Sequence, residues 1–249
     1  MKLAPLLIIP LLVLFSWSRP VGATTEITGT FVNPSGHCIL VSSQADVYIH
    51  DAIIGPCDGD GIKVLNSTRV TIRNVTIRDS AASIAIFSSS YVLVDGADLA
   101  GTTHPKPEGQ SVLLNASNHV TVQGVHTFAD NTNQEDAINV YKSSTVTVQD
   151  SVIVGGFSPT GCGIVIDTDS QNVTVQRNTV SDQSNCGIGL ASGTGHYVQN
   201  NTVMRTRQAY YANKFSGKKC GGTFRNNVTP DGGFWKGNCS ILQYGNSWN

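Results

Sequence analysis

The residues best suited to chemistry gather in two short stretches near the middle of the chain. The set comprises Glu135, Asp136, Asn139, Tyr141, Lys142, Asp167 and Asp169. Its four carboxylates match calcium, which takes about six to eight oxygen ligands. A calcium ion beside a sugar carboxylate would stabilise the enolate that forms when the adjacent C–H loses its proton. Lys142, deprotonated by its surroundings, would be the base that takes this proton.

The same residues also have a purely structural interpretation. Asp and Asn side chains are ordinary turn formers, because they hydrogen-bond to nearby backbone and tolerate left-handed conformations. Lys142 would then be a solvated residue that neutralises Asp167. Which interpretation holds depends on the elements that position the two stretches.

A repeat of short strands supplies those elements. Pairs of apolar residues separated by one residue recur 22 to 28 residues apart, and most are followed after five or six residues by a second such pair. The first pairs are Ile39-x-Val41, Ile62-x-Val64, Ile84-x-Ile86, Val112-x-Leu114, Ile138-x-Val140, Ile164-x-Ile166 and Ile188-x-Leu190. Alternation with a period of two predicts strands with one buried face.

Strands this short bury an apolar face only when successive coils stack and each strand pairs with its equivalents above and below. The pattern predicts an all-β, single-domain, right-handed parallel β-helix of about seven coils with capped ends. It would occupy residues 24–249, with a repeat core at about 37–230. A leucine-rich repeat is excluded because its leucine pattern is absent, and a propeller blade would need about 40 residues.

Extra residues in three coils indicate a groove. The segments 101–110, 130–135 and 155–161 all fall just before the first strand of a coil. Stacking would place them one above another, along one edge of the first sheet and beside the acidic stretches. Such loops can wall a binding site. The expected calcium ligands are Glu135, Asp136, Asp167 and Asp169, and the expected substrate-binding residues are Lys63, Asn139 and Tyr141.

Six cysteines suggest three disulfides in a secreted chain and allow fifteen pairings. Cys162 and Cys186 each lie two residues before the first apolar position of a coil. Stacking makes them vertical neighbours about 4.8 Å apart, within the range of disulfide Cα separations. The remaining cysteines would staple the two ends as Cys38–Cys57 and Cys220–Cys239.

Asparagines show two further patterns. Asn178, Asn201 and Asn227 each follow an interior residue by three positions, which predicts a ladder of stacked side chains at one bend. Asn-x-Ser/Thr sequons also recur, although the repeat itself favours Asn-Val-Thr. The expected glycosylation sites are Asn66, Asn74, Asn115, Asn172 and Asn200.

The two ends of the chain differ from the middle. Residues 1–23 predict a cleaved signal peptide, because a basic start, an apolar run and Val21-Gly22-Ala23 follow one another. We therefore expect a secreted protein without a membrane anchor. The tail after Phe215 loses the repeat and gains aromatic residues. We expect a C-terminal cap at about 215–249; for its aromatic residues, and for Tyr210-Tyr211, the alternative is a platform for sugars.

Two segments resemble a known superfamily. Residues 60–74 begin Asp-Gly-Ile-Lys-Val and end Val-Thr-Ile-Arg-Asn, and residues 137–148 have a similar pattern. Both resemble the repeat of the pectate-lyase-like superfamily, and the likeness extends over about residues 37–230. That superfamily contains pectate, alginate and chondroitinase-like lyases, uronan C5-epimerases, galacturonan hydrolases, phage adhesins and non-catalytic proteins. The resemblance therefore implies the fold and leaves the activity open.

A shorter stretch resembles one branch of this superfamily. Residues 135–143 are similar to the calcium-ligand and lysine segment of chondroitinase- and alginate-lyase-like enzymes. Those enzymes carry a second basic residue, an Arg, on the next strand, whereas residues 164–169 contain none.

The sequence thus leads to two functional hypotheses. The first is a secreted protein that acts on an acidic polysaccharide by β-elimination or C5 epimerisation, with calcium and Lys142. The second is a non-catalytic β-helix that binds glycans or serves in a cell wall or surface coat. A nucleic-acid binder is excluded, because removing Lys2 and Arg19 leaves 14 basic against 17 acidic residues and no basic stripe.

Overall fold

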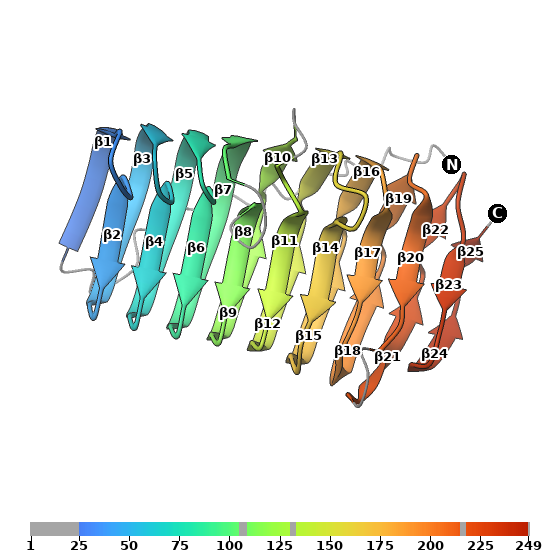
Figure 1. Ribbon diagram of the computed structural model, residues 1–249. Helices are drawn as coiled ribbons and strands as arrows, with labels where there is room; N and C mark the ends of the chain where they lie inside the picture. Colours follow the sequence, from blue (N-terminus) through green and yellow to red (C-terminus); the bar gives the residue numbers. More distant parts are fainter. Residues whose placement is uncertain (1–24, 105–108, 130–132, 215–217, 249) are drawn as a thin grey trace, which may run out of the picture.

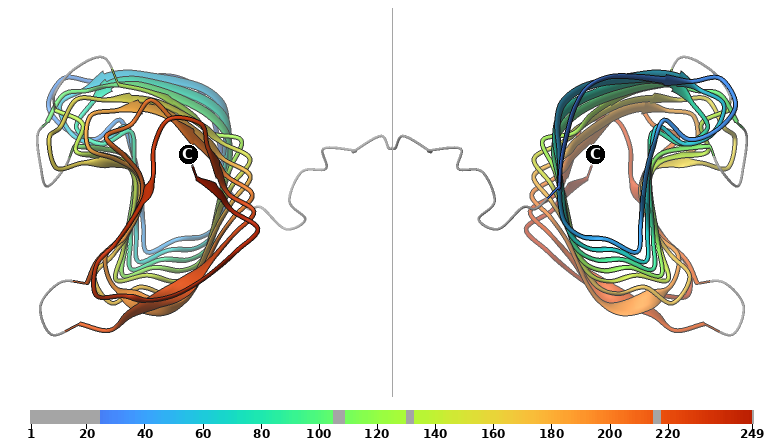
Figure 2. Two further views of the ribbon diagram at one scale, coloured as in Figure 1. Left: turned by 90° about the vertical axis from the view of Figure 1, so that its right-hand side faces the viewer. Right: turned by 90° about the vertical axis from the view of Figure 1, so that its left-hand side faces the viewer.

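The protein is a stack of parallel β-coils. The computed structural model describes residues 25–104, 109–129, 133–214 and 218–248. Within them the chain forms strands only, arranged in two sheets that run the length of the molecule (Figure 1). Viewed along the stack, the outlines of successive coils superpose (Figure 2). The parallel β-helix predicted from the repeat is confirmed, with about eight turns.

The first sheet has nine strands, paired in the order of the chain. Its strands are β2 (Ile39–Ser42), β4 (Ile62–Leu65), β6 (Ile84–Phe87), β8 (Gln110–Asn115), β11 (Asp136–Tyr141), β14 (Cys162–Asp167), β17 (Cys186–Leu190), β20 (Gln208–Ala212) and β23 (Phe234–Lys236). Seven of these strands contain the predicted apolar pairs. The other two, β20 and β23, account for the larger number of turns.

The second sheet has sixteen strands, many of them bent or split at a corner of the coil. They are β1 (Thr25–Asn33), β3 (Ala45–Cys57), β5 (Thr68–Ser80), β7 (Ser90–Thr102), β9 (Asn118–Gln123), β10 (His126–Phe128), β12 (Ser144–Gln149), β13 (Val152–Gly156), β15 (Gln171–Gln176), β16 (Thr179–Gln183), β18 (Gly193–Gln199), β19 (Thr202–Met204), β21 (Cys220–Arg225), β22 (Val228–Thr229), β24 (Ser240–Tyr244) and β25 (Ser247–Trp248). Every pairing between described strands is parallel.

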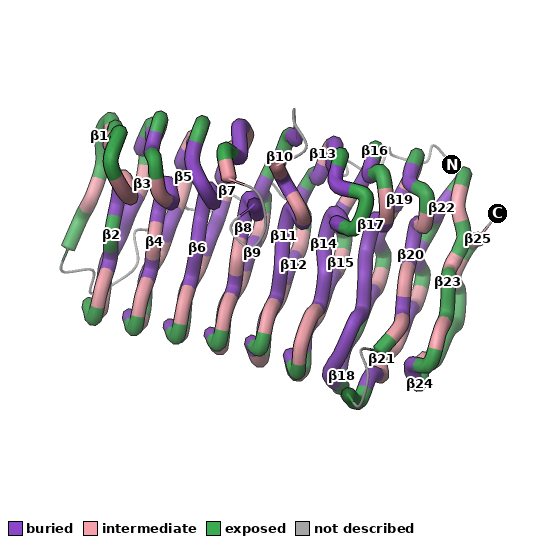
Figure 3. Tube along the Cα trace, in the orientation of Figure 1, coloured by how far each residue is buried: buried purple, intermediate pink, exposed green. Residues whose placement is uncertain are grey.

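The interior is a continuous apolar column. Most inward residues are Val, Ile and Leu with almost no exposed surface, such as Ile138 and Val140 of β11. Buried and exposed stretches alternate along every coil (Figure 3). β-branched residues pack well on a pleated surface. The apolar positions that define the repeat are therefore the ones that form the core.

The coils turn at corners where the backbone is left-handed. The corner after the nine-stranded sheet contains Ser43, Asn66, Ser88, Ala116, Lys142 and Asp169, all with positive φ. This conformation is uncommon outside glycine, and Asn and Asp tolerate it best. Lys142 and Asp169 are exposed at this corner. They therefore stand at the end of the strand and not on its face.

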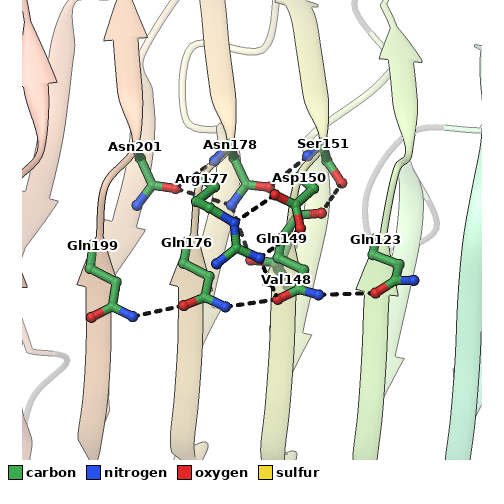
Figure 4. A network of polar contacts seen from close by, with 10 residues as sticks. All are labelled: Gln123, Val148, Gln149, Asp150, Ser151, Gln176, Arg177, Asn178, Gln199 and Asn201. Atoms are coloured by element: carbon green, nitrogen blue, oxygen red, sulfur yellow. Dashed lines mark hydrogen bonds and ion pairs between the residues drawn. The ribbon is translucent and has the colours of Figure 1, made fainter. Parts of the chain in front are cut away.

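Buried asparagines form a ladder inside another corner (Figure 4). Asn178 Nδ2 donates to Asn201 Oδ1 at 3.1 Å, and Asn201 Nδ2 donates to Asn227 Oδ1 at 3.1 Å. Each Nδ2 also donates to a backbone carbonyl of an adjacent coil, as Asn178 does to Val148. The predicted asparagine ladder is confirmed. It supplies hydrogen bonds where the turning backbone has none of its own.

Glutamines form a second ladder on the outer surface (Figure 4). Gln149 donates to Gln123 at 2.9 Å, Gln176 to Gln149 at 2.7 Å and Gln199 to Gln176 at 2.7 Å. Because each amide donates toward the N-terminal end, the ladder has one direction. Gln123 then donates to the Asp95 carboxylate at 3.1 Å.

The three predicted disulfides are confirmed. Cys162 and Cys186 join β14 to β17 with their Cα atoms 4.5 Å apart. The other two bonds, Cys38–Cys57 and Cys220–Cys239, lie toward the two ends of the stack. Disulfides are typical of oxidising compartments. Secretion stays a prediction, since the signal peptide at 1–23 lies outside the described residues.

The C-terminal tail both extends and closes the stack. It continues the coils, because β23 pairs with β20 and β24 pairs with β21. Its aromatic residues Phe234 and Trp248 are partly buried against the end of the apolar core. In the described part of the chain, no helix has the length and apolarity that a bilayer crossing requires.

The predicted glycosylation sites occupy the corners. Asn66, Asn74, Asn172 and Asn200 are exposed and have positive φ, and Asn115 is half-buried at the end of β8. Their modification stays a prediction.

Substitution in the two ladders should separate buried from exposed hydrogen bonds. Asn178→Ala leaves the Ser151 N–H, the Val148 carbonyl and Asn201 short of partners in the interior. Buried groups without partners cost about 1–3 kcal/mol each, so we expect a loss of about 3 kcal/mol or more in the free energy of unfolding. Gln176→Ala, on the same coil but on its outer surface, should cost about 1 kcal/mol. Urea denaturation with intact disulfides measures both, and equal losses would contradict the interior role of the asparagine ladder.

A buried histidine should make the stack sensitive to acid. His196 Nδ1 accepts the Val173 N–H at 3.2 Å, Nε2 contacts the Ser192 carbonyl at 3.1 Å, and burial lowers the His196 pKa to about 4. The unfolded chain, in which the ordinary pKa is about 6.5, then binds more protons between the two values. His196 should therefore lose up to about 3 kcal/mol of stabilisation as the pH falls from 6.5 to 4.

The difference in unfolding free energy between the wild type and His196→Asn isolates this contribution. It should shrink as the pH is lowered through that window. A difference that is constant from pH 7 to pH 4 would show that His196 keeps an ordinary pKa.

Candidate functional site

A hollow on the outer face of the nine-stranded sheet is the candidate site. It has a volume of about 500 Å³ and spans four coils, from β11 to β20. Its lining contains Glu135, Asp136, Pro159, Thr160, Cys162, Val165, Asp167, Asn185, Cys186, Ala191, Arg207, Gln208 and Tyr211. We call this hollow the groove. Three of the four predicted calcium ligands line it.

The register of the sheet explains this convergence. Parallel pairing places Asn139 beside Val165, Val165 beside Gly189 and Gly189 beside Tyr211, in one outward-facing column. Gly189 has no side chain there, and an added Cβ would lie 3.1 Å from the sulfur of Cys162. The groove is therefore deeper beside the Cys162–Cys186 disulfide. Residues from the preceding loops, such as Pro159 and Thr160, stand along one side.

Asp136 is a buried carboxyl on the wall of the groove. Its Oδ1 accepts the Cys162 backbone N–H at 2.8 Å, and its Oδ2 accepts Asn139 Nδ2 at 2.8 Å. Burial nevertheless raises the Asp136 pKa to about 7, and the nearby charges of Glu135 and Asp167 add to the rise. Asp136 thus exchanges its proton near neutral pH, as proton-transferring groups of enzymes do.

The other two acidic residues of the groove differ in their surroundings. Glu135 accepts hydrogen bonds from Ser158 Oγ and Thr160 Oγ1, both at 2.6 Å, so it fastens the loop before β14. Asp167 lies half-buried at the end of β14, where its Oδ1 accepts the N–H and hydroxyl of Thr168. Asp167 is therefore the carboxylate of the groove that keeps an oxygen available to a ligand.

Several predicted site residues lie elsewhere. Lys142 is exposed at the corner, with Nζ 5.1 Å from the centre of the Tyr141 ring. Asp169 forms an ion pair with Lys218 at the same corner. Lys63 lies on β4 in a separate hollow near the N-terminal end. The described residues that line the groove include neither Lys63 nor Tyr141, and neither Lys142 nor Asp169.

The predicted calcium ligands bind other protein groups in the described structure. Both oxygens of Glu135 and both oxygens of Asp136 already accept hydrogen bonds from the protein, and Asp169 points to Lys218. Within the described ranges, no group of three or more His, Cys, Asp and Glu side chains is arranged to hold a metal. The expected calcium ligands share a region, but they do not converge on one point.

Two groove residues were missed or left open by the sequence pattern. Arg207 is exposed just before β20, and it makes no ion pair with any described residue. Among the described residues that line the groove, it is the basic one. Tyr211 stacks on Trp235 with ring centres 5.0 Å apart and planes within 11°. Its neighbour Tyr210 is fully buried, so the pair divides between core and groove.

The signal for these residues was weak. The strand β20 has Tyr210 and Ala212 at the interior positions where the seven predicted coils have Val, Ile or Leu. The apolar repeat therefore did not reveal the coil, and the place of Arg207 beside the groove was not visible.

Several proteins of known structure have a similar fold. An alginate lyase from Paenibacillus sp. str. FPU-7 superposes with a TM-score of 0.68 at 13% identity, covering 88% of this chain and 82% of the enzyme. A DFA-IIIase from Arthrobacter chlorophenolicus gives 0.61 at 16% identity, with coverages of 83% and 54%. The A-module of a mannuronan C-5 epimerase from Azotobacter vinelandii gives 0.54 at 13% identity, with coverages of 87% and 64%. The chain spans only about half to two-thirds of the length of the latter two proteins.

The sequence supports the same relationship. No curated protein matches it. The model of the family described as "right handed beta helix region" matches residues 22–171 and, again, residues 111–247. The predicted likeness to pectate-lyase-like proteins is therefore confirmed for the fold. On the repeat, the stacked sheets and this match, the chain belongs to the right-handed β-helix family.

Proposed function

We propose that the protein is an enzyme that cleaves an acidic polysaccharide in the groove, with Asp136 as the proton donor. The observation that carries this proposal is the Asp136 carboxyl, which has a pKa raised to about 7 in the wall of a 500 Å³ groove. A general acid works best when its pKa lies near the working pH. If Asp136 had only a structural role, the fold would be more stable with a low pKa at this carboxyl or with an amide in its place.

The groove offers groups for each part of a cleavage. In β-elimination of a uronate chain, a base removes the C5 proton and the C5–H electrons form the C4=C5 double bond. The C4–O bond breaks, and the departing oxygen takes a proton. In this proposal Asp136 supplies that proton, and the Asp167 carboxylate accepts the one from C5. Arg207 binds the uronate carboxylate and stabilises the charge that develops on it.

The surroundings of Asp136 allow its proton to come and go. Asn139 Oδ1 is buried and has no partner among the described residues, whereas Asn139 Nδ2 donates to Asp136. When Asp136 is protonated, rotation of this amide by 180° lets Oδ1 accept the carboxyl proton. Asn139 therefore holds Asp136 in either protonation state.

Two proteins of known structure support a polysaccharide as the substrate. The alginate lyase and the mannuronan C-5 epimerase described above share the architecture, at identities that establish the fold alone. The expectation that the substrate is acidic rests on Arg207, an exposed cation in the groove that makes no ion pair with a described residue.

A second candidate is a non-catalytic glycan-binding β-helix. It is favoured by the hydrogen bonds that occupy both oxygens of Glu135 and both oxygens of Asp136. In that case the groove would bind sugar through Tyr211 and Arg207 without turnover. Cleavage assays on purified protein decide between the two candidates.

Asp136→Asn should abolish cleavage while preserving the fold. The new amide keeps one acceptor for the Cys162 N–H and can donate to Asn139 Oδ1. We expect kcat to fall by about 10²–10⁴-fold, the usual contribution of a general acid. Polygalacturonate, alginate and chondroitin are the substrates, with ultraviolet absorbance for unsaturated uronates and a reducing-end assay for hydrolysis. Asp169→Asn, at the exposed corner of a neighbouring coil, is the matched control and should keep full activity.

The pH dependence gives an independent check on Asp136. Because the protonated form is active, kcat/KM should fall as the pH rises above about 7. The raised pKa also means that the folded state binds more protons than the unfolded state between pH 3.8 and 7. Asp136 should therefore lower the free energy of unfolding of the wild type increasingly as the pH rises from 3.8 to about 7. Asp136→Asn should remove this pH dependence. Turnover that is unchanged by Asp136→Asn, or that requires calcium, would contradict the proposed mechanism.

Arg207→Gln should weaken the binding of acidic chains. Loss of a charge-assisted hydrogen bond costs about 1.5–3 kcal/mol, which corresponds to a rise in KM of about ten- to a hundredfold. Arg205→Gln is the matched control, since Arg205 lies two residues away and pairs with Asp182 outside the groove. The ratio of KM values for acidic and neutral polymers measures the effect. An equal KM for both variants would show that Arg207 does not bind the substrate.

A further inference from the structure

A second hollow lies on the same face of the nine-stranded sheet, near its N-terminal end. It has a volume of about 130 Å³ and is formed by β4, β6, β8 and the turns before β2, β4 and β6. Its lining contains His37, Gly59, Asp60, Lys63, Ala81, Ala82, Phe87 and Leu113. We call it the Lys63 hollow. It shares no residue with the groove.

The polar groups of the Lys63 hollow are held in place. Lys63 Nζ lies 3.2 Å from Asp60 Oδ2, and Asp60 is only 5% exposed. His37 Nδ1 accepts the Asp60 backbone N–H at 2.8 Å, which assigns the proton of neutral His37 to Nε2. The Lys63 ammonium, the Asp60 carboxylate and the His37 imidazole thus line one small hollow.

One wall of the Lys63 hollow is aromatic. Lys63 Nζ lies 5.2 Å from the centre of the Phe87 ring, and Leu113 and two alanines complete the apolar surface. A sugar ring combines hydroxyl groups at its edge with apolar C–H faces. A donor and an acceptor beside an aromatic ring match both parts, and a Lys–Asp pair that is neutral overall suits a sugar hydroxyl better than a free anion.

The two hollows are aligned along the stack. Pairing places Lys63 beside Leu40 and Ala85, and the same column continues through Leu113 and Asn139 into the groove. Lys63 on β4 and Tyr211 on β20 are separated by six steps of the nine-stranded sheet. At about 4.8 Å per step, they lie about 29 Å apart. An extended chain of several sugars can therefore reach both hollows.

We propose that the Lys63 hollow is a second sugar-binding site, which holds a distant unit of the polysaccharide chain whose reacting unit lies in the groove. Asp60 and Lys63 bind hydroxyls of that sugar, and Phe87 contacts its apolar face. This inference rests on the proposed function, because it takes the groove as the place where the chain reacts. It makes the protein selective for long chains, since short ones fill the groove alone.

Binding of oligosaccharides of increasing length tests the second site. Oligogalacturonates and oligomannuronates of two to eight units are titrated calorimetrically into Asp136→Asn protein, which keeps them uncleaved. Adding Lys63→Ala should weaken the binding of octamers about tenfold and leave that of trimers unchanged. Lys219→Ala, an exposed lysine just before β21, is the matched control and should alter neither.

A second variant covers the risk that Lys63→Ala leaves Asp60 buried without its partner and unfolds the coil. Phe87→Leu keeps an apolar side chain and the Lys63–Asp60 pair, and it should also weaken octamers but not trimers. Equal octamer affinity for Phe87→Leu and the parent protein would overturn the second site while leaving the groove intact. Failure of every oligosaccharide to bind the parent protein would instead overturn the proposed function and, with it, this inference.

Discussion

Each coil of this protein finds most of its backbone hydrogen-bond partners in the coils above and below it. Parallel pairing at one strand spacing forces equivalent residues into straight columns, and most other features follow from those columns. Val and Ile stack in the interior, serines and asparagines fill the corners, and cysteines two residues before a strand come within disulfide distance. A change in one coil is therefore felt first by its neighbours along the axis, as in other solenoid proteins.

The same constraint creates the groove and limits it. Asp136 is carried on the strand β11, so its carboxyl is held by the backbone of β14 and by Asn139 on its own strand. That rigidity keeps a partly charged group in a buried place, which costs stability and gives a proton donor that is active near neutral pH. The stack tolerates this because the apolar column continues beneath the groove without interruption.

The sequence was sufficient for the fold and for part of the site. Periodicity located seven coils, and the offsets of cysteines and asparagines predicted disulfides and a ladder, because columns convert spacing directly into contact. Alternation along the strand does not reveal the left-handed corner at which Lys142 lies, outside the groove. Arg207 was missed because β20 fills its interior with Tyr and Ala, which do not resemble the repeat. Hydrogen bonds to Glu135 and Asp136, which argue against calcium, depend on loop geometry that no pattern encodes.

The one-way glutamine ladder has a consequence for how such a chain can change in length. Arg225 donates to Gln199 at one end, and Gln123 donates to Asp95 at the other, so the charged residues terminate a series whose middle members are interchangeable. Duplication of an internal coil that carries a glutamine would extend this series without breaking a bond or requiring a new end. A coil inserted between β8 and β11 would lengthen the span between the Lys63 hollow and the groove by about one strand spacing and would leave intact the coils that line both hollows. The distance between the two hollows could thus change in steps of one strand spacing while both ends of the glutamine ladder stay unaltered.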